Sequence, residues 1–499
     1  MKFILKLRII ILMVLVAFAT NACDDFDDIN VNPTQAATVD PAFQLTRVQV
    51  TMSNNRYEYW RAQYIYCSTI IQHNACTFSY WSGDKYNRID SYSSALWDVT
   101  YPREVKNLVD LISRTAEDPA MVNYNATARI VKAYVFQRLT DLYGDIPYFE
   151  AGKGFLDANY SPVYDSQQVI YTDLLKEITE ATAALDDNAR LTGDIWLGND
   201  ITKWRKWGNS LRLRLGMRLS EVDPGSAERE VRAAISGGVM TSIDDMPVMF
   251  HTDLERNGNT AVMQADDNFR LSNTLVDYLR DNGDPRLPIW GMVYDDAGAE
   301  NPDWQNWVGL ANGLDADDLE EGELATFPRH NRTTVKDVTA PYFHHSYAEV
   351  EYMLAEAALR GWGAPLSAAE HFENGLRGAV EQVTLYANSA IDAGTLDAFV
   401  AANPLNTGSF EESLEHISTE YWANQYLNAM EAFANWRRTG YPQLTAVDHP
   451  IGTTNGTIPR RLYYPPSELA NNNANYLEAV SRQFGGEDEL TGRVWWDAQ

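Results

Sequence analysis

The sequence predicts a mainly α-helical protein in which two helical regions flank a loop-rich section. First, residues 125–142 contain no Gly or Pro, and their apolar side chains cover most of a helix surface. Second, segments on either side of this stretch repeat the helical spacing of apolar residues. Third, this pattern breaks down between Gly237 and Thr339, where Gly, Asp, Asn and Pro are frequent. We therefore expect a helical scaffold and, in the irregular section, short strands, short helices and long loops.

The helix that begins near Asn125 is expected to lie in the protein interior, because its polar groups occupy only a narrow strip. Gly144 stands where a helix end favours a left-handed residue, and Pro147 prevents the helix from continuing. The chain should therefore leave this helix within the sequence DLYGDIPY, Asp141–Tyr148.

Other helices are expected where apolar residues recur three and four positions apart. These segments cover residues 41–72, 97–112, 166–185, 202–221, 226–236, 346–361, 367–387 and 409–436. They come in pairs whose lengths suit antiparallel packing. No clean 34-residue period emerges, so the sequence does not establish a regular repeat array and leaves a degenerate one open. Beyond residue 465 we expect an Asn-rich turn.

The N-terminus indicates export. Lys2, Lys6 and Arg8 precede an apolar run that is long enough for a signal peptide and too short for a stable membrane span. We expect residues 1–22 to be removed and Cys23 to become a lipidated first residue, followed by an acidic tether over residues 23–40. The alternative is ordinary signal cleavage, in which Cys23 has no role.

The net charge of −29 restricts the partners of the protein. A field of this sign repels nucleic-acid phosphates and anionic lipid, so neither is expected to bind. The charge says nothing about the fold.

No metal site or cofactor is predicted. The sequence has no CxxC or Cys/His zinc spacing, and the adjacent pair His344 and His345 would face different ways on a helix. The acidic run at residues 315–323 fails the EF-hand pattern because Leu319 stands at a ligand position. Cys67 and Cys76 are either bridged or buried thiols, and both readings stay open.

Seven stretches, in order along the chain, resemble the SusD/RagB family and especially its SusD-like branch. They are Asp141–Tyr148 (DLYGDIPY), Trp204–Met217 (WRKWGNSLRLRLGM), Asp284-Pro285-Arg286-Leu287, Tyr347–Trp362 (YAEVEYMLAEAALRGW), Glu431–Leu444 (EAFANWRRTGYPQL), Ile458–Pro465 (IPRRLYYP) and the Trp495-Trp496-Asp497 ending.

The resemblance implies a non-catalytic, lipid-anchored outer-membrane protein that faces the cell exterior and captures nutrients. Its usual partner would be a SusC-like TonB-dependent β-barrel transporter. The resemblance also implies a single domain over residues 41–499, with tetratricopeptide-like helix pairs forming a scaffold at about 41–236 and 340–499. The loop-rich section at about 237–339 would carry the ligand. The arginines within residues 204–218, with Arg437 and Arg438, are expected to pair with acids inside the helix stack.

Ligand contacts are expected from aromatic residues in loops, because sugar rings present apolar C–H patches that stack on flat π surfaces. One loop offers Tyr80, Trp81 and Tyr86, and a second offers Trp304 and Trp307. Trp290 is a weaker candidate. The tryptophans expected to serve packing are Trp60, Trp97, Trp204, Trp207, Trp422, Trp495 and Trp496.

Three classes of function compete. The first is a nutrient-binding lipoprotein whose ligand is an oligosaccharide or, as in one branch of the family, a peptide. The second is a helical glycoside hydrolase, which would need two carboxylates at a defined separation across a cleft. Nothing in the sequence marks such a pair, and Gly-x-Ser-x-Gly, P-loop and HExxH motifs are absent. The third is a helical scaffold that binds protein partners.

Overall fold

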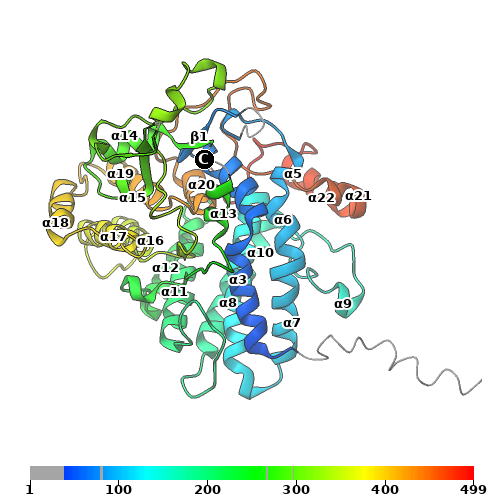
Figure 1. Cartoon of the computed structure of the whole chain (residues 1–499). Coiled ribbons are helices and arrows are strands. Elements are labelled where there is room, and N and C mark those ends of the chain that lie inside the picture. Colours follow the sequence, from blue (N-terminus) through cyan, green and yellow to red (C-terminus); the bar gives the residue numbers. More distant parts are fainter. Residues whose placement is uncertain (1–38, 79–82, 266–267, 296, 499) are drawn as a thin grey trace, which may run out of the picture.

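The computed structural model describes residues 39–78, 83–265, 268–295 and 297–498. Helices make up most of this part of the chain, and its strands are only two to four residues long. Figure 1 shows long helices in the lower half and at the left, with short strands and loops above them. The expectation of a mainly α-helical fold with a few short strands is confirmed.

The helix expected near Asn125 is α8, Val122–Tyr143, and it lies in the middle of the helical scaffold. It packs mainly against α7 (Lys106–Thr115) and α10 (Gln167–Ala184), and it also contacts α3 (Pro41–Asn54). Nearly all of its side chains beyond residue 125 are buried. The prediction of an interior helix is therefore confirmed.

Gly144 ends α8 as expected, although its backbone is not in the left-handed helical region. Its φ of 85° and ψ of −123° lie in a region that glycine occupies far more easily than other residues. Its N–H donates to the carbonyl oxygen of Thr140 at 2.8 Å, and a Cβ placed here would overlap the side-chain amide of Gln483. The turn brings Asp145 N–H to Gln483 Oε1 at 2.7 Å, which ties this helix end to α22 (Asn473–Phe484).

Replacing Gly144 by Ala is expected to lower the free energy of unfolding by about 2–3 kcal/mol, from the unfavourable φ and the displaced Gln483. Urea denaturation of the purified chain would measure this loss. Gly238→Ala is the matched control, since Gly238 has φ 86° and no atom within 4 Å of the added Cβ. The control should lose only the unfolding free energy that the unfavourable φ costs. An equal loss in both variants would show that displacing Gln483 contributes nothing.

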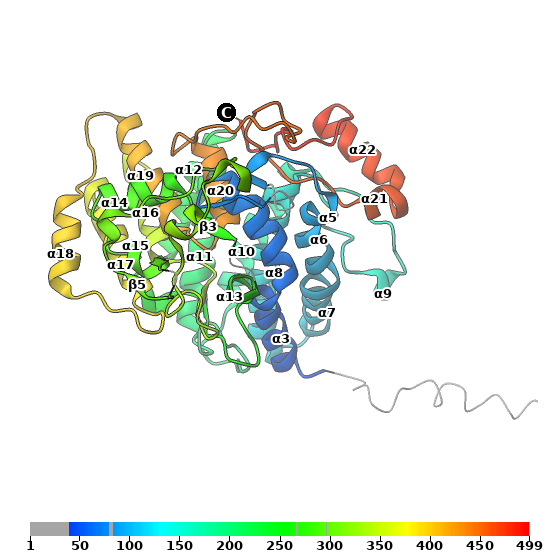
Figure 2. The same cartoon turned by 45° about the horizontal axis from the view of Figure 1, so that its top comes forward.

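Helices that follow one another in the sequence pack side by side to form the scaffold, and two groups of helices can be followed in Figure 2. The first group continues from α10 through α11 to α12, and the second joins α16 to α17 and α19. The bounds of the new members are α11 Ile201–Arg218, α12 Pro224–Gly237, α16 Tyr347–Leu359, α17 Ala368–Val383, α18 Ala393–Ala402, α19 Phe410–Asn424 and α20 Ala429–Thr439.

Two segments expected as single helices are interrupted. Residues 41–72 form α3, then α4 (Arg56–Glu58) and the π-helix η1 (Tyr59–Ser68), because Asn55 leaves the helical conformation and its side chain caps the Tyr57 N–H. Residues 409–436 divide into α19 and α20, where Leu427 adopts a φ of 70°.

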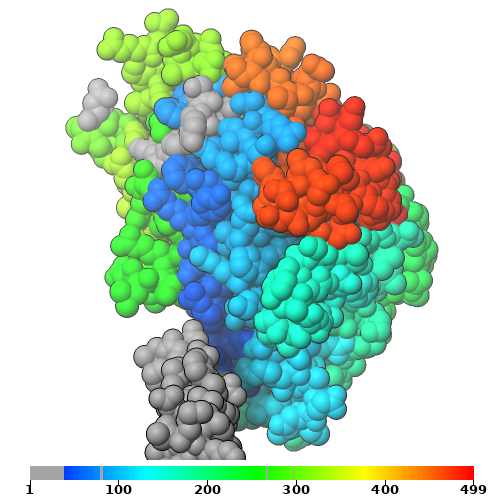
Figure 3. Space-filling view, turned by 90° about the vertical axis from the view of Figure 1, so that its right-hand side faces the viewer, coloured from blue at the N-terminus to red at the C-terminus, as the bar shows by residue number. Residues whose placement is uncertain are grey.

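The C-terminal region is more helical than expected. Where a turn was expected after residue 465, the chain forms α21 (Pro466–Asn471) and then α22. Figure 3 shows these helices beside the segment that carries α9 (Gly154–Asp157), and Asn475 Nδ2 donates to the carbonyl oxygen of Ser161 at 3.1 Å. The remaining helices before the loop-rich section are η3 (Gly83–Lys85), α5 (Asp90–Ser93), α6 (Ala95–Thr100), the π-helix η4 (Tyr101–Val105) and η5 (Pro119–Met121).

The loop-rich section contains strands of three small antiparallel sheets, two of which, β1 with β3 and β2 with β7, join it to the scaffold. Strand β1 pairs with β3, β2 pairs with β7, and β4 lies between β5 and β6. The strands are β1 Asn74–Cys76, β2 Val248–Met249, β3 Phe269–Leu271, β4 Gly291–Tyr294, β5 Glu300–Asn301, β6 Arg329–His330 and β7 Tyr342–Phe343. The short helices between them are η6 Ile243–Asp245, α13 Gly258–Ala265, α14 Asn273–Asp281, α15 Leu287–Trp290, η7 Trp304–Asn306, η8 Ala316–Asp318 and η9 Glu323–Thr326.

Most of the arginines expected to pair with acids do so. Arg214 forms two hydrogen bonds with Glu349, at 2.6 and 2.8 Å, and both side chains are buried. Arg218 pairs with Glu431, and Arg438 pairs with Glu356 at 2.7 Å.

Arg437 differs from this pattern. It donates to the backbone carbonyl oxygens of Phe433 and Arg460, and burial lowers the pKa of its guanidinium to about 10. The expectation of an acidic partner for Arg437 was therefore wrong, because one carbonyl from within α20 and one from the segment at Arg460 accept its hydrogen bonds instead.

Cys67 and Cys76 are both buried thiols and are not bridged to each other, which decides between the two alternatives left open by the sequence. Burial raises the pKa of the Cys67 thiol to about 12, so this thiol stays protonated at neutral pH.

Candidate ligand-binding cleft

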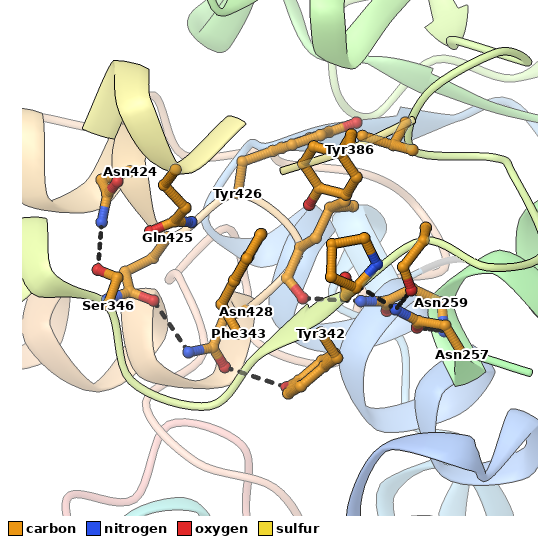
Figure 4. A pocket seen from close by; sticks show the side chains of 15 residues that line it. Asn257, Asn259, Tyr342, Phe343, Ser346, Tyr386, Asn424, Gln425, Tyr426 and Asn428 are labelled. Atoms are coloured by element: carbon orange, nitrogen blue, oxygen red, sulfur yellow. Dashed lines mark hydrogen bonds between the residues drawn. The ribbon is translucent and has the colours of Figure 1, made fainter. Parts of the chain in front are cut away.

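An enclosed polar cavity lies between the scaffold and β7. Figure 4 shows amide and phenol side chains around it, with Asn428 Nδ2 donating to Gln425 Oε1 at 2.9 Å and Asn424 Nδ2 donating to Ser346 Oγ at 2.9 Å. The cavity measures about 20 Å³, which is room for about one water molecule. It cannot hold a sugar residue. Some of its amides bond to neighbouring groups, whereas Asn259 Oδ1, Gln382 Oε1 and the Tyr426 hydroxyl have no partner among the described residues.

A much larger cleft opens in the loop-rich section, and we call it the ligand cleft. Its volume is about 780 Å³, within the range of small-molecule sites. The walls come from the end of β4, from β5, from the segment after η7 and from the turn at η9. The lining residues are Val293, Tyr294, Asp295, Asn301, Asn306, Trp307, Val308, Glu321, Gly322, Glu323, Ala325 and Thr326.

Trp307 and Tyr294 are the aromatic residues of the ligand cleft. The Trp307 side chain is held by packing, with 3% of its surface exposed, and its carbonyl oxygen accepts a hydrogen bond from Arg280 Nη1 at 2.9 Å. Its indole Nε1 is buried and has no hydrogen-bond partner among the described residues. The guanidinium of Arg332 lies 4.1 Å from the ring centre of Tyr294, and the Tyr294 hydroxyl accepts a hydrogen bond from the Arg332 N–H.

Amides and carboxylates complete the lining. Asn306 Nδ2 donates to Asp303 Oδ2 at 2.7 Å, so this amide is fixed beside Trp307. Val308, next in the chain, is 59% exposed and adds an apolar surface at the opening. Tyr294 and Trp307 are each 3% exposed, so only a small part of either ring reaches the cleft. Together with the exposed Val308 and the oriented polar groups they form a surface that can contact both apolar and hydroxylated parts of a ligand.

The structure places the loop aromatic residues proposed from the sequence in different environments. Trp307 lines the ligand cleft. Trp304 is half-buried in η7, packs against the core and is not among the lining residues. Tyr80 and Trp81 lie outside the described residues.

The expectation of an exposed Tyr86 ring was wrong. Tyr86 is 1% exposed, its hydroxyl accepts a hydrogen bond from the Val447 N–H at 3.3 Å, and its carbonyl oxygen accepts one from the Thr453 N–H at 3.0 Å. The neighbouring Lys85 forms an ion pair with Asp315 at 2.8 Å. A C-terminal loop therefore covers Tyr86, a contact that no local pattern could reveal.

Sequence reasoning missed Tyr294, Val308 and the two glutamates of the ligand cleft, Glu321 and Glu323. Tyr294 ends a strand that has no clear alternation, and the two glutamates belong to the acidic run that was interpreted as a solvated surface. The one available signal was their position in the same irregular section as Trp307.

Most tryptophans assigned to packing are buried as expected. Trp290 is also in the core, with its ring centre 4.9 Å from that of Tyr426. The buried members are Trp97, Trp204, Trp207, Trp422 and Trp496, while Trp60 and Trp495 are partly buried against the core.

The chemistry of the remaining ionisable groups indicates structural roles. His344 and His345 are buried, and burial lowers the pKa of both imidazoles well below the ordinary value, so they are neutral. Within the described ranges, no group of three or more His, Cys, Asp or Glu is placed to hold a metal ion. No helix among the described residues combines the length and apolar character needed to cross a membrane.

Comparison with known proteins identifies the family. A sequence profile described as SusD-like, starch-binding and associating with the outer membrane, matches residues 33–465. The chain belongs to the SusD-like family. The resemblance found in the seven sequence stretches is thereby confirmed over most of the chain.

Solved SusD-like structures have the same fold. A protein named chitin-binding protein is 39% identical, with a TM-score of 0.84 over 92% of this chain and all of the other. A SusD-like protein from Bacteroidetes is 28% identical, with a TM-score of 0.82 over the same shares. A chitin-binding SusD homologue from Flavobacterium johnsoniae, at 24% identity and a TM-score of 0.76, covers 92% of this chain and 98% of its own and shows likeness of fold. A search of curated proteins found no match.

Proposed function

We propose that this SusD-like protein is a non-catalytic glycan-binding lipoprotein that captures an oligosaccharide in the ligand cleft. The observation that carries the proposal is the cleft of about 780 Å³ in which Trp307 and Tyr294 stand beside oriented amides. The name of the 39% identical relative suggests chitin fragments, which are chains of N-acetylglucosamine, as the first ligand to try. Each such residue has an apolar ring face and an acetamido group that can bond with amides and with an indole N–H.

Two of the acids of α16 are not available for hydrolysis. Glu349 and Glu356 are buried in ion pairs with Arg214 and Arg438, and neither lines the ligand cleft. A hydrolase needs two accessible carboxylates on either side of the scissile bond. A peptide ligand is the second candidate, because the amides and carboxylates of the cleft could also bond to a peptide backbone.

The proposal includes anchoring and delivery. Cys23 would carry the lipid, residues 23–40 would form the tether, and the ligand would pass to a SusC-like TonB-dependent transporter in the outer membrane. Helix α3, which follows the proposed tether in the sequence, begins at the lower edge of the ribbon in Figure 1. Labelling with a radioactive fatty acid, lost in Cys23→Ser, would test the anchor, and co-purification from outer membranes would test the partner.

Replacing Val308 by Arg is expected to weaken binding of a chitin hexasaccharide by about tenfold or more, because the long charged side chain would fill the opening of the cleft. Isothermal titration calorimetry would measure the Kd. Val308 suits this purpose because it is 59% exposed, whereas truncating the buried Trp307 would also disturb packing.

Val169→Arg is the matched control, since Val169 is 48% exposed on α10 and does not line the cleft. Its Kd should equal that of the unchanged chain. If both variants bind equally well, the ligand cleft is not the binding site. Release of shorter sugars during the titration would instead indicate a hydrolase, and a co-purifying protein with no sugar binding would indicate a scaffold.

A further inference from the structure

The segment of the chain that forms most of the ligand cleft is strongly acidic. Between Tyr294 and Arg329 the sequence contains ten Asp or Glu residues and no Lys, Arg or His. We propose, building on the glycan-binding function above, that the cleft selects oligosaccharides with free amino groups, such as partly deacetylated chitin fragments, over neutral ones and excludes uronic acids.

Three of these carboxylates line the cleft itself: Asp295, Glu321 and Glu323. No described Lys or Arg forms an ion pair with any of them. In contrast, Asp315 in the same acidic run forms an ion pair with Lys85 at 2.8 Å, and His449 Nε2 lies 3.1 Å from its second carboxylate oxygen. Among the described residues, the three cleft carboxylates therefore lack the paired cation that Asp315 has.

The carboxylates also keep acceptors for a ligand. Asp295 Oδ1 accepts a hydrogen bond from the Ala299 N–H at 2.7 Å, and Glu323 Oε2 accepts one from the Glu320 N–H at 2.8 Å. These bonds hold each carboxylate in position and leave its second oxygen for a donor. An ammonium group offers three donors and a full positive charge, which makes it the natural complement.

The aromatic residues of the cleft contribute ring surface and not negative charge. The guanidiniums of Arg332 and Arg329 lie 4.1 and 5.5 Å from the ring centre of Tyr294, so cations of the protein already contact this ring. These arginines contact the ring and are not part of the cleft lining. Trp307 lines the cleft with part of its ring, while its indole Nε1 is buried and has no partner among the described residues.

A bound metal ion is a less suitable complement to these carboxylates. No group of three potential ligands comes together among the described residues, so the acids of the cleft are spread along its walls. An elongated ligand with several positive charges can pair with carboxylates that lie apart along the cleft, whereas a single ion cannot reach them all. A uronic-acid chain would bring negative charges into this field and be repelled.

Calorimetric titration of the full chain with three oligosaccharides of equal length tests the proposal: chitohexaose, its fully deacetylated glucosamine counterpart and a galacturonic acid hexamer. At mildly acidic pH and low salt, the glucosamine hexamer should bind about tenfold more tightly than chitohexaose, and high salt should remove the difference. The galacturonic acid hexamer should not bind. Equal affinity for the first two sugars, or binding of the third, would overturn the selectivity.

The double variant Glu321→Gln with Glu323→Gln should lose the preference, so that the glucosamine hexamer and chitohexaose bind it with similar affinity. The matched control is Glu117→Gln with Glu487→Gln, two exposed acids outside the cleft lining, which should keep the preference. A preference that survives in the first variant would overturn the assignment to the cleft carboxylates. If chitohexaose and the glucosamine hexamer both fail to bind the unchanged chain, the proposed glycan-binding function fails as well.

Discussion

Replacing Arg214 by Met is expected to lower the free energy of unfolding by about 3–5 kcal/mol, the largest loss that we expect from a single substitution in this protein. Arg214 is the partner of Glu349, and both side chains are at most 2% exposed. Without the guanidinium, the described groups that face the Glu349 carboxylate would be neutral: the Tyr421 hydroxyl at 2.8 Å, the Gln425 amide at 2.6 Å and the His345 imidazole, whose Nε2 lies 3.3 Å away. A buried carboxylate without a compensating charge is costly. Urea denaturation at neutral pH would measure the change.

Arg205→Met is the control on the same helix. Arg205 pairs with Asp187 at the surface, where solvent screens the interaction, so the loss should stay below about 1 kcal/mol. Combining Arg214→Met with Glu349→Leu should recover much of the loss, because no charge is then left buried. A small effect of Arg214→Met alone would show that water reaches Glu349 or that the pair contributes little.

Replacing Glu104 by Gln is expected to remove most of the decline in stability as pH rises from about 4.5 to about 8. Glu104 lies in the π-helix η4, and burial, with a further contribution from the Glu58 carboxylate, raises the pKa of its side chain to about 8. Arg138 lies close enough to oppose this rise, but it is bonded to Glu58 at 2.7 Å.

The sign follows from proton binding. Between about pH 4.5 and 8 the folded protein holds a proton on Glu104 that the unfolded chain has released, so stability falls with rising pH, by on the order of 4 kcal/mol over the whole window. Glutamine cannot ionise, so the variant should be more stable than the parent at pH 8 and similar to it at pH 4.5. Thermal midpoints across this range would measure the difference.

Glu117→Gln is the matched control for this experiment, because Glu117 is exposed just beyond α7. Its pH profile should follow that of the parent. Parallel profiles for Glu104→Gln and the parent would show that Glu104 is ionised in the folded protein at neutral pH. The buried Asp84, whose pKa burial raises to about 6, should leave a residual slope in the same direction in all three proteins.

The helical scaffold could be predicted because its signals are local. Each signal depends on residues within about one to five helical turns of one another. The signals are the apolar pattern of α8, the glycine at its end and the spacing in α10 to α12. Predictions failed where a break depends on a single backbone conformation, as at Leu427 between α19 and α20. The Asn-rich segment near residue 472 looked like a turn, but α22 packs on the rest of the chain and is stabilised there.

The candidate site was predicted only in part. The irregular section was correctly expected between the two helical regions, and one of its ring-bearing residues, Trp307, lines the ligand cleft. Tyr86 looked equivalent in the sequence, with turn-forming neighbours and no helical spacing, yet residues more than 350 positions away cover it. Burial of a loop side chain depends on such distant contacts, which composition does not encode.

By itself the sequence determined the class of the fold, the family and the sign of the charge around the ligand section, because each is set by residue types and short-range spacing. The tertiary structure decided which rings and carboxylates share the cleft and which are enclosed. Those outcomes arise when β4, the segment after η7 and the turn at η9 come together across the chain. The free energy of that assembly comes from the shared core, and no short stretch of sequence contains it.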